Sequence, residues 1–346
     1  MKRQAIVVVL GVLWTVGSAA WAQPARDICD AIGTRRGLFV VAAEDAKLAK
    51  ELAQAQPVVV FIAAPTTKVE SLRAELVAAN LHGRVTVGSV RGNRLPLIDN
   101  IAAVLIDPGG TIDTKEAMRV VRPLGHLYSR KTATQKPWTK GADNWGQYHY
   151  NAAMTDRSND MVAGPARGIQ WLAGDNSIQP AKMGVRVVGS LIVQVEERGV
   201  VVRDAFSGLP VWRRPELKPS NRYAFLADEK HVYLIPRANS RNPIYPPHMV
   251  AIDLKTGKNV LEYNQGVKLG WAIVGHSYAE NKKIEKTDRD KAKKNTERAK
   301  KSYEAVQARL ADGVLLQTIH NKMVALEAAT GKMLWEKNLT GSVEVS

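Results

Sequence analysis

Three segments in the second half of the chain repeat one pattern, and this repeat constrains the fold more than any other feature. In each, an apolar strand ends at an acidic residue. Two spacers, a Ser or Thr, a Gly and, four positions later, a large apolar residue follow. The copies are Asp204, Ser207, Gly208 and Trp212, then Asp253, Thr256, Gly257 and Leu261, and finally Glu327, Thr330, Gly331 and Trp335. The repeat predicts an array of similar β-units.

The residue types of the repeat have a physical reading. The acidic side chain can accept N–H groups of the turn that follows the strand, and the hydroxyl of Ser or Thr adds a weaker bond. The glycine supplies the positive φ that a tight turn needs. The chain then reverses, so that the Trp or Leu reaches the buried face. We therefore expect a hairpin within a four-stranded sheet, with the aromatic ring packed between neighbouring sheets.

The third copy, residues 321–336 (NKMVALEAATGKMLWE), resembles the repeat of the quinoprotein (PQQ-like) β-propellers. That family includes alcohol dehydrogenases that use pyrroloquinoline quinone (PQQ) and cofactor-free scaffolds of the bacterial envelope. The resemblance implies propeller blades over 185–346. We expect strands at 185–195, 199–204, 210–214, 222–227, 231–236, 249–253, 259–263, 313–319, 322–327 and 332–336. A closed propeller needs roughly 4–8 blades. About three are present, so we expect an incomplete arc with open edges that favour self-association.

Strands and helices alternate over residues 23–135. Apolar runs predict strands at 37–43, 58–62, 85–87, 101–107 and near 125–129, and helical spacing predicts helices at 45–54, 67–80 and 114–121, after a short helical lead-in at 23–36. Short connections between alternating elements are typical of a parallel, Rossmann-like α/β sheet.

This half resembles class I S-adenosylmethionine methyltransferases, most closely in residues 80–87 (NLHGRVTV). Two features of that family are missing. The loop Ala42–Lys47 after the first strand has no glycine, and the second strand ends at Ala64-Pro65 with no carboxylate for ribose hydroxyls. We therefore expect a degenerate, inactive domain. Asp99 and Asp107 are the carboxylates expected near the carboxyl edge, where ligands of α/β folds bind.

Residues 136–184 form a Trp-rich junction. In order along the chain, it contains Trp145, His149, Ser158, Asp160, Pro165, Gln170 and Trp171. This order of residues, and the arrangement of α/β half, junction and blades, resemble those of large secreted proteins of planctomycete-type bacteria. The candidate functional residues of the junction are Trp145, His149, Asp160 and Trp171. Among them, His149 could face a funnel at the domain boundary.

Residues 1–22 have the pattern of a secretory signal peptide. Lys2 and Arg3 precede an apolar core, and Ala20-Trp21-Ala22 forms a cleavage site. We therefore expect a periplasmic or extracellular protein. Cys29 is the only cysteine. A single cysteine excludes an internal disulfide and a zinc site built from several thiolates.

The chain of 346 residues has a formal net charge of +16. Residues 281–301 carry ten Lys or Arg and four acids, which is +6 of that total. We expect a basic helical insert at 279–310 that projects from the blades. Its segment Lys282–Lys301 could contact an anionic surface, such as lipid or acidic glycan. Nucleic acid is not expected, because an exported protein meets little of it.

The main functional hypothesis from the sequence is an exported, non-catalytic propeller scaffold that binds a protein or glycan of the cell envelope. The first alternative is a quinoprotein dehydrogenase with PQQ and Ca²⁺. The second is an S-adenosylmethionine-dependent methyltransferase, which export from the cytosol disfavours. No catalytic residue, metal site or cofactor is predicted, since the repeat acids occur once per unit and no Ser-His-Asp, G-x-S-x-G or Walker pattern is present.

Overall fold

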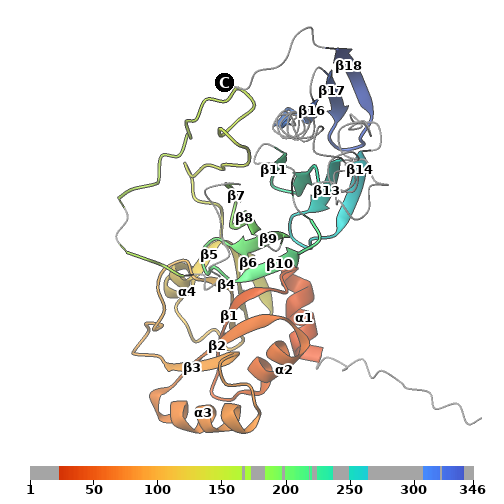
Figure 1. Ribbon diagram of the computed structural model, residues 1–346. Helices are drawn as coiled ribbons and strands as arrows, with labels where there is room; N and C mark the ends of the chain where they lie inside the picture. Colours follow the sequence, from red (N-terminus) through yellow and green to blue (C-terminus); the bar gives the residue numbers. More distant parts are fainter. Residues whose placement is uncertain are drawn as a thin grey trace, which may run out of the picture.

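The computed structural model describes residues 23–165, 168–172, 184–196, 199–217, 219, 224–236, 249–263, 307–319 and 322–338 (Figure 1). The predicted signal peptide (1–22) and the Lys282–Lys301 segment lie outside these ranges, as does the predicted insert up to residue 306. Within the described ranges, no helix is long and apolar enough to cross a membrane.

The first half of the chain forms a six-stranded sheet in the order β3-β2-β1-β4-β5-β6. Strands β1 to β5 run parallel to their neighbours, and β6 runs antiparallel to β5. The strands are β1 (Gly37–Ala42), β2 (Val58–Ala64), β3 (Val85–Ser89), β4 (Ala102–Asp107), β5 (Val121–Ser129) and β6 (Thr132–Gln135). The predicted Rossmann-like α/β fold is confirmed in this part.

Helices cover both faces of this sheet. The helical elements are α1 (Gln23–Ile32), α2 (Lys47–Ala55), the 3-10 turn η1 (Thr66–Lys68), α3 (Val69–Ala78) and α4 (Thr114–Val120). Alternate side chains of β1 point to opposite faces. Phe39 packs with α1, α2 and α3, whereas Val40 packs with α4 and the loop before β4. Val77 of α3 is 61% exposed, because the buried face of this helix follows Leu72 and Leu76.

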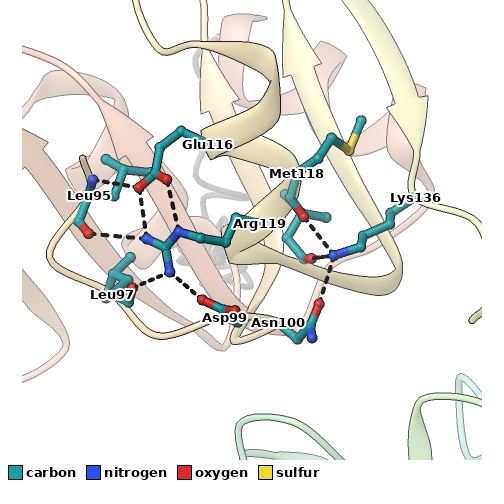
Figure 2. A network of polar contacts seen from close by, with 9 residues as sticks. Leu95, Leu97, Asp99, Asn100, Glu116, Met118, Arg119 and Lys136 are labelled. Carbon is teal, nitrogen blue, oxygen red and sulfur yellow. Dashed lines mark hydrogen bonds and ion pairs between the residues drawn. The ribbon is translucent and has the colours of Figure 1, made fainter. Parts of the chain in front are cut away.

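Arg119 of α4 fixes the long loop between β3 and β4 (Figure 2). Its guanidinium makes a bidentate contact with the Glu116 carboxylate, at 2.8 and 2.7 Å, and an ion pair with Asp99 at 2.6 Å. It also donates to the carbonyl oxygens of Leu97 and Leu95, at 2.9 and 3.3 Å. Glu116 in turn accepts the Leu95 N–H at 2.7 Å. All five guanidinium N–H groups are therefore used, three on the loop itself and two on Glu116, which in turn holds the loop.

Lys136 closes the end of helix α4 (Figure 2). Its ammonium donates to the carbonyl oxygens of Met118 and Val121, at 2.6 and 2.8 Å, and to Oδ1 of Asn100 at 2.7 Å. A cation at this position satisfies carbonyls that have no partner within the helix and interacts favourably with the helix dipole. The residue that begins the junction thus ties it to the α/β sheet.

Three four-stranded antiparallel sheets follow, as the repeat predicts. Their orders are β10-β9-β8-β7, β11-β12-β13-β14 and β15-β16-β17-β18. The strands are β7 (Val185–Val188), β8 (Leu191–Glu196), β9 (Gly199–Asp204), β10 (Pro210–Arg214), β11 (Phe225–Ala227), β12 (His231–Leu234), β13 (Met249–Asp253), β14 (Asn259–Tyr263), β15 (Gln307–Ala311), β16 (Val314–Ile319), β17 (Lys322–Glu327) and β18 (Met333–Asn338). In the part of the chain that the structure describes, these three sheets do not close into a ring.

The strand prediction differs from the structure in three places. The single strand expected at 185–195 is two strands, because the chain turns at Gly189, whose φ is 54°. Residues 307–310, which were assigned to the helical insert, begin strand β15. Strand β6 was missed because its hairpin turn uses Arg130 and Lys131 at positive φ, where glycine or asparagine is usual.

The repeat acids lie in the turns that join the third and fourth strands of the pattern. Oδ1 of Asp204 accepts the N–H groups of Phe206 and Ser207, at 3.0 and 2.8 Å, and the Ser207 hydroxyl at 3.0 Å. Oδ1 of Asp253 accepts the N–H and hydroxyl of Thr256, both at 2.7 Å. In the third copy, the Thr330 hydroxyl donates to Glu327. Gly208, Gly257 and Gly331 have φ of 69°, 72° and 73°.

An aromatic residue joins the first sheet to the second through this turn. Nε1 of Trp212, in β10, donates to the carbonyl of Leu254 at 2.8 Å. The Trp212 ring also covers Gly257, where an added Cβ would lie 2.8 Å from it. The glycine is therefore needed twice, for its positive φ and for the close approach of the ring.

The same contact occurs before the first sheet. Nε1 of the junction residue Trp171 donates to the carbonyl of Ala205 at 2.9 Å. A Cβ on Gly208 would lie 2.4 Å from the Trp171 ring. Trp171 therefore contacts the first sheet as Trp212 contacts the second.

Between the second and third sheets the aromatic residue is Tyr263. Its hydroxyl donates to the carbonyl of Ala328, and its ring lies 3.2 Å from a Cβ built on Gly331. The repeat had placed Leu261 in this role, but Leu261 lies two residues earlier on the same face of β14 and is only half-buried. Trp335, the equivalent residue of the third sheet, is 45% exposed.

A buried ion pair links the α/β sheet to the first antiparallel sheet. Nε of Arg122, in β5, lies 2.5 Å from Oδ2 of Asp204, and the two side chains are 9% and 2% exposed. The Nε–H does not point along this contact, so the attraction is ionic and not a hydrogen bond. Asp204 thus uses one oxygen for its own turn and the other for the domain boundary.

A tripeptide of the junction contacts all three antiparallel sheets, one residue per sheet. It meets β7, β11 and β15, and β11 itself contacts both of the other two strands. Backbone hydrogen bonds make two of the contacts, and the side-chain amide of Gln147 makes the third. The contacts are Trp145 with Val187 (N to O 2.7 and 3.0 Å), Gly146 with Ala227 (2.8 Å) and Gln147 with Leu310 (2.7 and 2.9 Å).

Candidate functional site

The strand order of the α/β sheet changes direction between β1 and β4. From β1 the chain proceeds through β2 to β3 on one side, and from β4 to β5 on the other. In doubly wound sheets, ligands bind at the carboxyl ends of the strands where this change occurs. The loops that follow β1 and β4 therefore form the candidate site.

The loop after β1 presents two exposed carboxylates and two small residues. Glu44 and Asp45 are exposed, whereas Ala42 and Ala43 are half-buried. Oδ1 of Asp45 accepts the Lys47 N–H at 2.9 Å, at the start of α2. None of residues 38–79 has a positive φ, so the turn uses ordinary backbone conformations and needs no glycine.

Hydroxyl groups lie at the ends of the next two strands. Thr66 and Thr67 follow β2 and are exposed, and Ser89 ends β3 and is half-buried. Because β1, β2 and β3 are parallel neighbours, their carboxyl ends lie at one edge of the sheet. The edge therefore offers hydroxyls at β2 and β3 and free carboxylate oxygens at β1.

Asp107, at the end of β4, shapes its own loop. It is 1% exposed. Its Oδ1 accepts the Thr111 hydroxyl at 3.1 Å, and its Oδ2 accepts the Ile112 N–H at 2.7 Å. Asp99, which was expected at the same edge, lies at the opposite one, because it precedes β4 and pairs with Arg119. That expectation was wrong.

The predicted junction residues do not gather into one site. Nδ1 of His149 lies 2.8 Å from both carboxylate oxygens of Asp156. Asp160 accepts the backbone N–H of Asp143 at 3.0 Å and those of Val162 and Ala163 at 2.8 and 2.7 Å. Trp145 and Trp171 make the separate contacts described above.

Asp143 is the centre of the junction, although no sequence pattern distinguishes it from the other acidic residues there. Its Oδ2 accepts the Tyr150 hydroxyl at 2.7 Å, the Asn159 N–H at 2.8 Å and the Ser158 hydroxyl at 3.2 Å. The Tyr150 hydrogen bond is the main cause that lowers the pKa of Asp143. The carboxylate therefore stays ionised and holds the loop.

The described residues contain no group of three or more His, Cys, Asp or Glu that could hold a metal ion. His248, His276 and His320 lie outside those residues. Cys29 is buried against α2, and burial raises the pKa of its thiol to about 11. It is therefore a packing residue and not a nucleophile at neutral pH.

Comparison with known proteins gives a likeness to part of the chain. No protein-family model matches, and no curated protein matches. A protein assigned as an S-adenosyl-L-methionine-dependent methyltransferase from Methanococcus maripaludis is 15% identical, with 38% of this chain covering 59% of that one at a TM-score of 0.29. A sarcosine dimethylglycine methyltransferase assigned in Galdieria sulphuraria is 15% identical (31% and 43% covered, TM-score 0.27), and the [4+2]-cyclase SpnF is 17% identical (31% and 43%, 0.28).

The chain spans less than two thirds of the length of these structures. TM-scores this low assign no activity to it. The likeness is one of fold alone, and it differs from the predicted function. The main hypothesis was a non-catalytic scaffold and its first alternative a quinoprotein dehydrogenase. The similar structures are instead enzymes of the methyltransferase fold, which agrees with the second alternative.

Proposed function

We propose that this chain is an S-adenosylmethionine-dependent methyltransferase, with the cofactor at the carboxyl edge of the α/β sheet. The observation that carries the proposal is the change of strand order between β1 and β4, with the exposed carboxylates of Glu44 and Asp45 in the first loop beside it. S-adenosylmethionine supplies an electrophilic methyl group when bound.

The residues at this edge fit the cofactor in their chemistry. Glu44 and Asp45 would hold its ammonium group, because carboxylates are the natural partners of a cation. Thr66 and Thr67 would accept from and donate to the ribose hydroxyls in place of the missing carboxylate. Ala42 and Ala43 would let the backbone approach the ligand, since a methyl group is the smallest side chain after that of glycine. Residues at the same edge would thus replace the glycines and the carboxylate that the family pattern contains and this chain lacks.

We also propose that the three antiparallel sheets are consecutive blades of a PQQ-like propeller arc. The support is the repeated contact in which Trp171, Trp212 and Tyr263 each donate to the turn of the next sheet. Blades arranged about an axis place their first strands together. A crystal structure in which β7, β11 and β15 do not surround a common axis would contradict this arrangement.

Calorimetric titration of the purified protein with S-adenosylmethionine tests the proposed activity. We expect saturable binding, weakened about tenfold or more in the Glu44→Gln, Asp45→Asn double variant because the ammonium loses its ionic partners. Glu262→Gln is the matched control: it removes an exposed carboxylate from β14, in the second antiparallel sheet. Wild-type protein that gives no heat at millimolar S-adenosylmethionine would overturn the proposal.

A further inference from the structure

A pocket of about 1030 Å³ lies between the α/β sheet and the first two antiparallel sheets. Its α/β wall consists of residues 32–36, Gln56 and the start of β5, which precede or begin strands. The pocket is therefore at the amino edge of the parallel sheet, opposite the candidate cofactor site. Its other walls are the turn at 188–191 and the repeat turn at 254–258.

The floor of the pocket holds two polar side chains from β5. Arg122 is 8% exposed and pairs with Asp204, as described above. Nδ1 of His126 is buried and has no hydrogen-bond partner within the described residues. Burial, with Arg122 and Lys255 nearby, lowers the pKa of His126, so this ring is neutral at neutral pH. It can therefore donate or accept one hydrogen bond to a ligand.

The charges around the pocket are mostly positive. Arg36, Lys255 and Lys258 are exposed, line the pocket and make no ion pair within the part of the chain that the structure describes. Arg35 lines it too and pairs with Asp30. The acidic lining residues are Asp204, which Arg122 neutralises, and Glu229. Lining cations thus exceed lining anions by five to two.

We propose that this pocket binds a small polyanion that carries at least two phosphate or carboxylate groups. Two features support this ligand class. Cations that have no ion-pair partner among the described residues converge from two separate units of the fold, and the buried Nδ1 of His126 has no hydrogen-bond partner among those residues. Lys255 and Lys258 flank Gly257, the glycine covered by Trp212, so the repeat turn that joins the sheets also holds the ligand in place.

Calorimetry with inorganic pyrophosphate at low salt tests the site, with succinate as the carboxylate probe. We expect saturable binding that weakens about tenfold or more in the Lys255→Gln, Lys258→Gln double variant. The matched control is Lys115→Gln, which removes an exposed lysine of α4 that does not line the pocket. Binding of pyrophosphate alone would assign the site to phosphate groups, and binding of succinate alone would assign it to carboxylate groups.

A second measurement locates the binding and does not depend on the variants. In the NMR spectrum of the wild-type protein, pyrophosphate should shift the ring signals of His126 and leave those of exposed His82 unchanged. Absence of binding by the wild-type protein, equal losses in Lys115→Gln, or an unshifted His126 would overturn the proposal. Since S-adenosylmethionine is titrated separately, at the opposite edge of the sheet, either proposal can fail alone.

Discussion

The Nε atom of Arg122, in the α/β sheet, lies 2.5 Å from Oδ2 of Asp204, in the repeat turn of the first antiparallel sheet, and both side chains are buried. Asp204→Asn keeps Oδ1 as an acceptor for the turn but leaves Arg122 as an uncompensated buried charge. We expect a loss of about 3–5 kcal/mol in the free energy of unfolding, measured by chemical denaturation.

Asp253→Asn provides the control for that experiment, because it changes the same turn position where no Arg or Lys pairs with it in the described structure. It should cost less than about 1 kcal/mol. A double variant, Arg122→Met with Asp204→Asn, should be more stable than Asp204→Asn alone, since no buried charge remains. Equal effects of Asp204→Asn and Asp253→Asn would show that the ion pair contributes nothing.

Trp212→Phe tests the contact between the first and second sheets. The variant keeps a ring over Gly257 but leaves the Leu254 carbonyl without its donor, which should cost about 1–3 kcal/mol. Trp335→Phe is the matched change at an exposed position and should cost less than about 0.5 kcal/mol. Thermal unfolding of both variants measures the difference. Similar losses would contradict the inferred role of the indole N–H.

Gly146→Ala tests the junction tripeptide. A Cβ at residue 146 would lie 2.2 Å from the Ala227 carbonyl oxygen, so the backbone has to shift and the bond to β11 is strained. We expect a loss of about 1–3 kcal/mol, read from the urea midpoint. Gly164→Ala, where no atom lies within 4 Å of the added methyl, should be neutral. A stable Gly146→Ala protein would mean that the tripeptide does not hold the sheets together.

Acid should release the loop that Arg119 holds. The Arg119 hydrogen bond is the main cause that lowers the pKa of Glu116 in the folded protein below its value of 4.5. The resulting stabilisation is complete above pH 4.5 and is lost as the pH falls through the folded pKa. Glu116→Gln should remove about 1.5–3 kcal/mol at pH 7 and flatten the stability profile below pH 4.5. Glu70→Gln, which breaks an exposed pair, should leave that profile unchanged.

Export is a separate prediction of the sequence. Expression of the whole chain in a Gram-negative host should give a periplasmic protein whose first residue is Gln23, as N-terminal sequencing would show. Ala22→Glu should block cleavage, because the site requires a small residue. A full-length protein retained in the cytosol would contradict export. It would also place the chain where S-adenosylmethionine is available, so this measurement bears directly on the proposed activity.

Local patterns predicted much of the fold. The strand ends at Asp204 and Asp253 follow from apolar runs closed by a turn-forming acid, and the alternation of strands and helices over residues 37–129 gave the parallel sheet. Tyr263 was missed because it follows Asp253 by ten residues, whereas the repeat places its large apolar residue at eight. Arg122 and Gly146 were missed because their importance comes from partners 82 and 81 residues away, as their numbers show. Pairing at that distance leaves no local pattern.

The candidate site was less predictable than the fold. The absence of glycine from Ala42–Lys47 suggested lost function, but the loop adopts ordinary backbone angles, so glycine is not required for its shape. The pocket between the sheets could not be found from sequence at all, because its lining residues Arg36 and His126 of the α/β part meet Lys255 only through the packing of that part against the antiparallel sheets.

The contacts of the tripeptide at 145–147 also determine the order in which parts of the chain can fold. Gln147 bonds to Leu310, which is 163 residues further along the chain. During synthesis the tripeptide therefore emerges long before its last partner exists, and the ends of a very long loop have to meet before the contact forms. Contacts of this range are slow to form. The α/β part can be complete while the ribosome is still working, whereas the three sheets reach their final arrangement only when the third has been made.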